Sequence, residues 1–136
     1  MQSISPETIY RGNYAWDESL PQITKLTKSP LILGRGIQTN NLRNNIFNDL
    51  KNQKLNVNSA NLQFDCCYED ILRVKDIILK NKHDSVIAAG GGKVLDAGKY
   101  IADCLKIPCI TLPISDSTCA GWTALSNIYT KDGQFI

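Results

Sequence analysis

Residues 90–93 read Gly-Gly-Gly-Lys, and their types and spacing suit chemistry better than any other group in this sequence. Glycines let the backbone approach a ligand closely, and the free N–H groups of a following helical turn point toward that ligand. The ammonium of Lys93 and the positive end of the helix dipole both favour an anion there. The pattern therefore predicts a phosphate-binding turn, and the alternative interpretation is a glycine turn that only packs tightly.

The segments on either side of this turn are the elements that must position it. Residues 84–89 read as a short buried strand, and residues 93–105 carry apolar side chains at steps of three and four. That second segment is predicted to be a helix with the apolar stripe Val94, Ala97, Ile101 and Leu105. A strand, a glycine turn and a helix start together make the framework of a phosphate site.

A nucleoside-triphosphate P-loop is the first ligand site to test, through its motif Gly-x-x-x-x-Gly-Lys-Ser/Thr. Counted back from Gly92, the first glycine of that motif falls on Ile87. The hydroxyl that would hold magnesium falls on Val94. Since both positions carry apolar side chains, hydrolysis of ATP or GTP is not expected.

A second glycine segment, residues 34–39, follows an apolar run that begins at Leu31. It is similar to the dinucleotide fingerprint Gly-x-Gly-x-x-Gly, but Thr39 stands where the third glycine belongs. We interpret it as a glycine turn ahead of a helix with Thr39 as the N-cap. Because ligands of open α/β sheets bind at the carboxyl ends of strands, the loop remains a candidate for one side of the site.

The rest of the chain alternates between predicted strands and helices. Strands are expected at residues 8–16 (an edge strand), 31–33, 55–62, 107–112 and 127–130, and helices at residues 20–26 (with Pro21 in the first turn), 40–51 and 68–81. This alternation predicts an α/β fold with a doubly wound parallel sheet and helices on both faces. We expect one domain over residues 1–136, and a fragment, because the sequence stops inside an apparent hairpin at residues 127–136.

The bulk composition excludes several classes of protein. Hydrophobic residues make up 43% of the 136 residues and charged residues 21%, as in an ordinary globular protein. The Lys and Arg residues are dispersed and the net charge is only +2, so no nucleic-acid partner is expected. Neither a membrane span nor a secretory signal is visible, so we expect a cytoplasmic protein without membrane contact. The five cysteines fit no zinc spacing and are expected to be reduced thiols, some of them in the core.

Two segments resemble a known family. Residues 90–99 are similar to the GGGK-x-x-D-x-x-K segment of the iron-containing alcohol dehydrogenases, in their glycerol dehydrogenase branch. Residues 112–130 are similar to that branch's P-T-x-A-S-T-D-A-x-x-S-A-L-S-V-I-Y loop, and the spacing between the two segments matches without a gap. A weaker resemblance extends over almost the whole chain from Tyr10 onward. Dehydroquinate synthase and glycerol-1-phosphate dehydrogenase share the superfamily but match the second loop less well.

The resemblance implies an architecture and a function. Family members have an N-terminal Rossmann-like domain that binds NAD or NADP, and an all-helical C-terminal domain that holds zinc or iron. The resemblance therefore implies that residues 1–136 are a single NAD(P)-binding domain without the helical metal-binding domain. It further implies a metal-dependent NAD(P)-linked alcohol or polyol dehydrogenase, in which the metal polarises the alcohol and hydride passes to the nicotinamide.

The resemblance also implies site residues. Those implied to bind the cofactor are Gly91, Gly92 and Lys93 at the pyrophosphate, Asp96 beside the cofactor, and Ser117, Thr123, Leu125 and Tyr129 along its ribose and nicotinamide. Taken alone, Asp96 reads as an ordinary first-turn acid and Tyr129 as a core aromatic.

Three positions depart from the family pattern. Cys119 stands where the branch has an aspartate that helps to hold the polyol, so Cys119 is a candidate substrate contact. Nearby Trp122 replaces a small residue. Because of these two differences, glycerol is not assigned as the substrate. Arg35 stands where NAD-using members hold the adenosine ribose with an acid; both a 2′-phosphate contact, which would mean NADP, and a solvated arginine remain open. The lone His83 is interpreted as a surface residue, so no metal site is expected within this chain.

Two other functions remain open at this point. One is a non-catalytic nucleotide-binding module, and the other is a lyase related to dehydroquinate synthase. For the dehydrogenase, we expect a small alcohol or polyol as substrate and no turnover by these 136 residues alone, and assembly into a homo-oligomer is left open.

Overall fold

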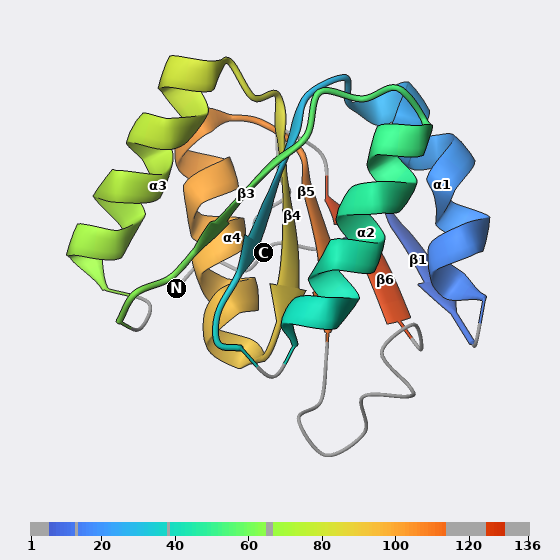
Figure 1. Cartoon of the computed structure of the whole chain (residues 1–136), viewed down its shortest axis with the longest axis horizontal. Coiled ribbons are helices and arrows are strands. Elements are labelled where there is room, and N and C mark those ends of the chain that lie inside the picture. The colour runs from blue at the N-terminus through green and yellow to red at the C-terminus, as the bar shows by residue number, and fades with distance from the viewer. Residues whose placement is uncertain (1–5, 13, 38, 65–66, 114–124, 130–136) are drawn as a thin grey trace.

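The computed structural model of the chain describes residues 6–12, 14–37, 39–64, 67–113 and 125–129. Within them, six strands form one sheet in the order β1-β6-β5-β4-β2-β3 (Figure 1). The strands are β1 (Thr8–Arg11), β2 (Pro30–Gly34), β3 (Asn58–Asn61), β4 (Ser85–Gly90), β5 (Cys109–Pro113) and β6 (Leu125–Tyr129). The helices are α1 (Ala15–Leu26), α2 (Asn40–Asn52), α3 (Tyr68–Asn81) and α4 (Gly92–Leu105).

The centre of the sheet is parallel, as the alternation of elements predicts. β2 pairs in parallel with β3 and β4, and β4 pairs in parallel with β5. The exception is β6, which runs antiparallel to both of its neighbours, β5 and β1. β1 lies at one edge of the sheet, as expected for this segment.

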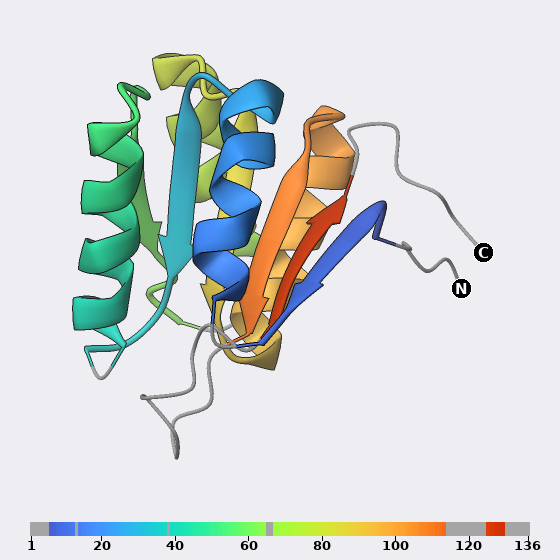
Figure 2. The same cartoon turned by 90° about the vertical axis from the view of Figure 1, so that its right-hand side faces the viewer.

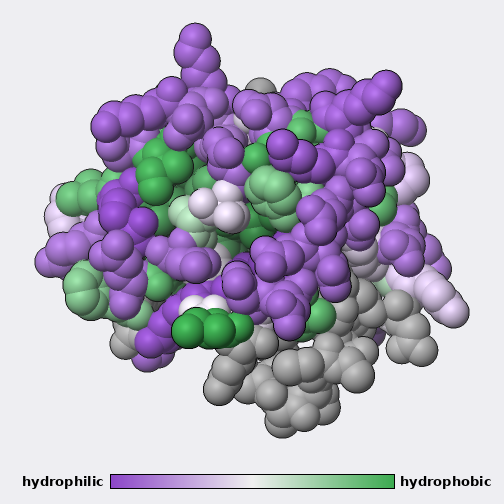
Figure 3. Space-filling model, viewed as in Figure 1, coloured by the Kyte–Doolittle hydropathy of each residue, from purple (hydrophilic) through white to green (hydrophobic). Residues whose placement is uncertain are grey.

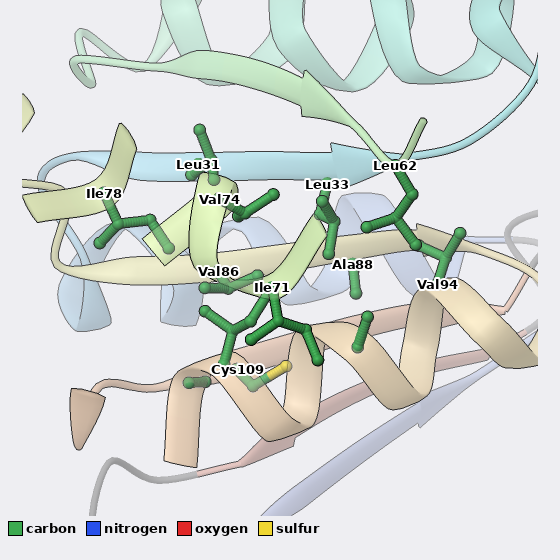
Figure 4. Close-up of a cluster of buried hydrophobic side chains, with 13 residues drawn as sticks. Leu31, Leu33, Leu62, Ile71, Val74, Ile78, Val86, Ala88, Val94 and Cys109 are labelled. Carbon is green, nitrogen blue, oxygen red and sulfur yellow. The ribbon is translucent and has the colours of Figure 1, made fainter. Parts of the chain in front are cut away.

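Helices cover both faces of the sheet, which confirms the expected doubly wound α/β fold. α1 and α2 lie on one face, and α3 and α4 lie on the other (Figure 2). The side chains of β2 alternate accordingly: Leu31 and Leu33 pack with α3 and α4 (Figure 4), whereas Ile32 packs with α1 and α2. β4 repeats this alternation with Val86 and Ile87. Strands buried on both faces read as continuous apolar runs, which is why these two were visible in the sequence.

The N-terminal region differs from the sequence prediction. The strand expected at residues 8–16 ends at Arg11, and the helix expected to begin near residue 20 begins at Ala15. Pro21 therefore lies inside α1 and not in its first turn. Pro21 is exposed, and Trp16 and Ile23 form a buried stripe at helical spacing on the opposite side. The packing of this stripe compensates for the hydrogen bond that the proline removes, so the helix continues through it.

The other boundaries agree more closely. α3 has the predicted bounds, residues 68–81, and α2 ends one residue later than expected. The strand predicted at residues 55–62 pairs with β2 only over Asn58–Asn61, although Leu55, Val57 and Leu62 are buried beside it. The turn and returning strand expected after residue 130 lie outside the described residues. No helix in the described part of the chain is both long and apolar enough to cross a membrane.

Candidate functional site

The two glycine segments of the sequence meet at one pocket. They follow β2 and β4, which are neighbouring parallel strands, so both turns emerge at the same edge of the sheet, the lower edge in Figure 1. The pocket has a volume of about 620 Å³. The segment after β2 contributes Arg35, Gly36, Ile37 and Thr39 to its lining, and the segment after β4 contributes Gly90, Gly91, Gly92, Lys93 and Val94.

The strand order explains why a crevice opens at this place. From β2 the chain passes through α2 to β3, and from β4 it passes through α4 to β5 on the opposite side. α2 and α4 lie on opposite faces of the sheet (Figure 2). The two connections therefore diverge, and the point between β2 and β4 is the topological switch point at which open α/β sheets bind their ligands.

The glycines of the turn after β4 and of α4 serve different purposes. A Cβ added at Gly91 or Gly92 would meet no atom within 4 Å, so these residues leave open space in front of the turn. At Gly98 a Cβ would lie 2.6 Å from the Cβ of Ala88, so that glycine lets α4 pack closely on β4. Gly91 has φ −83° and ψ −172°, an extended conformation that any residue adopts. The backbone conformation at Gly91 therefore does not require glycine, and the missing side chain leaves space in front of the turn.

The electrostatics of the pocket favour an anion. Gly92, Lys93 and Val94 are the first residues of α4, and the N-cap residue Gly91 offers no side chain to bond the N–H groups of this turn. The cations Lys93 and Arg35 lie in the pocket wall, and both are exposed. This combination fits a phosphate or diphosphate group.

Thr39 is the N-cap of α2, as predicted, but its side chain does not cap the helix. Its hydroxyl instead donates to the carbonyl of Arg35 at 3.4 Å and accepts a hydrogen bond from Arg43. Sequence reasoning missed Arg43, which is only 4% exposed and lies behind this loop. A signal was present, since Arg43 occupies the same buried stripe of α2 as Ile46 and Leu50, where a charge is unusual.

The other predicted site residues are distributed as follows. Asp96 lies one turn into α4, is 72% exposed and pairs with Lys99 at 3.9 Å, outside the lining of this pocket. Leu125 begins β6 opposite Arg11, on the side of the sheet where the carboxyl ends of the central strands and the pocket lie. Tyr129 ends β6 opposite Cys109, where the amino ends of the central strands lie. Ser117, Cys119 and Thr123 lie outside the described residues.

The prediction that His83 is a surface residue is wrong. Its side chain is buried, with 5% exposed. Nδ1 lies 3.1 Å from the carbonyl oxygen of Ser29, and Nε2 lies 3.2 Å from the amide nitrogen of Asn58. The ring is buried because it bridges the polar beginnings of β2 and β3, at the edge of the sheet opposite the pocket.

The described cysteines are free thiols in three environments: Cys104 is exposed, Cys67 is half-buried and Cys109 is buried. Burial raises the pKa of Cys109 to about 12, with the charge of Lys99 opposing the rise in part. This mixture agrees with the expectation of free thiols with some in the core. In the part of the chain that the structure describes, no three His, Cys, Asp or Glu side chains form a group that could hold a metal ion.

Comparison with known proteins gives a consistent result. The sequence profile of the family called iron-containing alcohol dehydrogenase matches residues 6–135. Glycerol dehydrogenase 1 of Schizosaccharomyces pombe is 31% identical over 135 residues, which is 96% of this chain and 29% of that protein. Glycerol dehydrogenase of Thermotoga maritima is 36% identical over 99 residues, covering 73% of this chain and 26% of that protein.

The fold agrees with solved structures as well. The crystal structure of the Schizosaccharomyces pombe glycerol dehydrogenase matches with a TM-score of 0.66 at 20% identity, over 82% of this chain and 30% of that one. The chain thus spans less than a third of the length of each of these relatives. The profile match extends over nearly all of the sequence, and the chain therefore belongs to the iron-containing alcohol dehydrogenase family.

Proposed function

We propose that this chain is the nucleotide-binding part of a metal-dependent, NAD(P)-linked alcohol or polyol dehydrogenase. The observation that carries the proposal is the pocket at the switch point between β2 and β4, where two glycine turns and the start of α4 meet. Relatives named glycerol dehydrogenase add support for the reaction class. In this proposal residues 1–136 form one NAD(P)-binding domain, and a helical domain of the whole enzyme carries the metal.

The pocket fits the diphosphate of a dinucleotide. Gly91 and Gly92 leave a cradle that a Cβ would fill, and the N–H groups at the start of α4 offer hydrogen bonds to phosphate oxygens. Lys93 adds a positive charge at the same place. The bound nicotinamide would supply hydride acceptance or donation, while these residues bind and orient the cofactor.

The remaining roles are part of the same proposal. Asp96, Ser117, Thr123, Leu125 and Tyr129 are proposed to line the cofactor, and Cys119 to contact a small alcohol or polyol substrate. Zinc or iron is assigned to the whole enzyme, and no residue described here is assigned to it. A cytoplasmic location also belongs to the proposal.

Titration of the purified chain with NADH and NADPH by isothermal calorimetry tests the binding role. We expect saturable binding at one site, weakened about tenfold or more by Gly91→Val, which fills the cradle, and by Lys93→Met. Lys51→Met removes an exposed lysine from the far end of α2 and is the matched control, expected to leave the affinity unchanged. Lack of saturable binding by either nucleotide would contradict the proposal.

The choice between NAD and NADP depends on Arg35. If this exposed guanidinium in the pocket wall receives a 2′-phosphate, NADP binds more tightly than NAD, and Arg35→Gln removes most of the difference. A clear preference of the unmodified chain for NAD would leave Arg35 as a solvated side chain.

A non-catalytic module and a dehydroquinate synthase-like lyase are less favoured. The relatives that support the assignment are named for dehydrogenase or reductase activity, including a glycolaldehyde reductase of Halobacterium salinarum that is 24% identical over 131 residues. If the purified whole enzyme oxidised no alcohol with either cofactor, the result would contradict the dehydrogenase and favour the lyase or the non-catalytic module.

A further inference from the structure

A buried arginine lies directly behind one wall of the nucleotide pocket. Arg43 comes from the first turns of α2 and is only 4% exposed. Its Nη2 donates to the carbonyl of Gly36 at 2.7 Å, and its Nη1 donates to the hydroxyl of Thr39 and, at 3.4 Å, to the carbonyl of Arg35. All three acceptors belong to residues that line the pocket.

Within the described residues, no carboxylate balances the charge of this guanidinium. Its three acceptors are neutral oxygens, and among the described residues no Asp or Glu forms an ion pair with Arg43. By contrast, Arg73 on α3 pairs with Asp70 at 3.0 Å. Burial lowers the pKa of Arg43, but an arginine remains protonated at neutral pH. A buried cation without a counter-ion is unfavourable, and an anion in the adjoining pocket would relieve that cost.

The position of the guanidinium also depends on the end of β2. A Cβ added at Gly34 would lie 2.1 Å from Nε of Arg43 and 2.2 Å from its Cδ, so only glycine leaves room for this side chain. Arg43 thus connects the end of β2, the loop residues Arg35 and Gly36, and the start of α2. The next glycine, Gly36, has φ +81°, so the loop that Arg43 holds has a conformation that other residues rarely adopt.

We propose that Arg43 is a positioning residue of the nucleotide pocket. Its buried positive charge, which no carboxylate in the described part of the chain balances, makes the affinity rise with the number of phosphate charges on the ligand. The inference rests on the proposed function of the pocket. Arg43 does not touch the ligand: it holds Arg35, Gly36 and Thr39 in the pocket wall and adds to the positive potential there. A purely structural role would not produce a dependence on ligand charge, and this dependence is what the experiment measures.

The experiment titrates the full 136-residue chain with inorganic pyrophosphate, NAD and NADP at low and moderate salt. For Arg43→Met we expect binding of pyrophosphate and NADP to weaken about tenfold or more, a smaller loss for NAD, and a weaker dependence on salt. Arg43→Lys keeps the charge without the fork of donors and is expected to recover the salt dependence but only part of the affinity. Gly34→Ala displaces the guanidinium without removing it and is expected to weaken all three ligands.

The matched control is Arg73→Met, which removes an arginine of α3 that bonds the carbonyl of Asn61 and not the pocket wall. We expect it to leave both affinity and salt dependence unchanged. The inference is overturned if Arg43→Met, folded by circular dichroism, binds the three ligands as the parent chain does, or loses the same factor for each at unchanged salt dependence. If Arg43→Met does not fold, Arg43→Lys decides: an unchanged affinity overturns the inference. Failure of the parent chain to bind any of the three ligands would instead contradict the proposed function.

Discussion

The two ends of the central strands differ in how their polar groups are satisfied. In the turns after β2 and β4, Gly36, Gly91 and Gly92 face open space, and the starts of α2 and α4 have no side-chain cap. At the amino ends of the same strands, side chains bond the neighbouring loops. The carboxylate of Asp84 accepts from the N–H groups of Lys28 at 2.9 Å and Ser29 at 3.0 Å, and from the hydroxyl of Thr27.

The cations at the two ends differ in the same way. At the amino end, Lys25, Lys51 and Lys80 lie in the last turns of α1, α2 and α3, where a cation complements the helix dipole. Hydrophilic residues accordingly cover the upper rim in Figure 3, where the helix-to-strand loops lie. At the carboxyl end, Lys93 and Arg35 line a pocket at helix starts, where the dipole has the same sign as the cations. The polar groups at the amino end are satisfied by other groups of the fold, and at the carboxyl end we propose that an anion completes the site.

The largest expected effect comes from removing the carboxylate at the amino end. Asp84→Ala leaves the N–H groups of Lys28 and Ser29 without their acceptor, so we expect the free energy of unfolding to fall by about 2–4 kcal/mol. Urea denaturation measures this loss. Asp103→Ala is the control, since it removes only a surface ion pair with Lys106 at 3.5 Å and is expected to cost less than about 1 kcal/mol. Equal losses for the two variants would contradict the contrast between the ends.

Acid should reduce the same stabilisation. Burial raises the pKa of Asp84, but the hydrogen bonds from Thr27, Lys28 and Ser29 outweigh this effect, so the pKa in the folded protein is below the ordinary value of about 3.9. Its stabilisation is therefore fully present above that value and is lost as the pH falls through the lowered pKa. Asp84→Asn should then be less stable than the parent chain at neutral pH, and the gap should narrow in acid. Denaturation curves between pH 7 and strong acid measure this difference in the free energy of unfolding. A difference that stays constant with pH would contradict the stabilisation by the ionised Asp84 carboxylate.

Gly91, in the turn after β4, and Gly98, inside α4, provide the next contrast. Gly98→Ala places a Cβ 2.6 Å from Ala88, and the steric cost of about 1–3 kcal/mol exceeds the gain in helix propensity of about 0.5–1 kcal/mol. Gly91→Ala meets no atom within 4 Å and should change stability by less than about 0.5 kcal/mol. Nucleotide binding should show the reverse order among folded variants, because Gly91 faces the pocket and Gly98 faces the sheet. Urea denaturation and nucleotide titration of both variants test this contrast. A clear loss of stability in Gly91→Ala would contradict it.

The smallest expected effect is a gain of stability at the amino end. Lys82 and Lys106 are the C-cap residues of α3 and α4, and both have φ 57°, in the left-handed region. Lys82→Gly and Lys106→Gly should each stabilise the chain by about 0.5–1 kcal/mol, because glycine adopts this conformation without steric cost. Thermal denaturation measures the change. Lys80→Gly, inside the last turn of α3, is the control and should destabilise by about 1 kcal/mol.

Local sequence patterns predicted much of this protein. The apolar stripe of α3, the buried runs of β2 and β4, and the glycine turn at residues 90–92 could be identified because periodicity reports burial and consecutive glycines report an open backbone. The predicted bounds were wrong where packing overrides a local signal, as at Pro21, which remains inside α1 because Trp16 and Ile23 of the same helix pack into the core.

The sequence by itself determined that a strand, a glycine turn and a helix would follow one another here, since these depend on neighbours along the chain, and the anion site at their junction is a proposal. Only the tertiary structure decided that β2 lies beside β4, because strand order depends on contacts between residues more than fifty positions apart, such as Ile32 and Ile87. That pairing brought residues 35–37 and Thr39 to the pocket, placed Arg43 behind it and buried His83 at the opposite end. Local patterns could not reveal these arrangements, because each depends on which surfaces the sheet brings together.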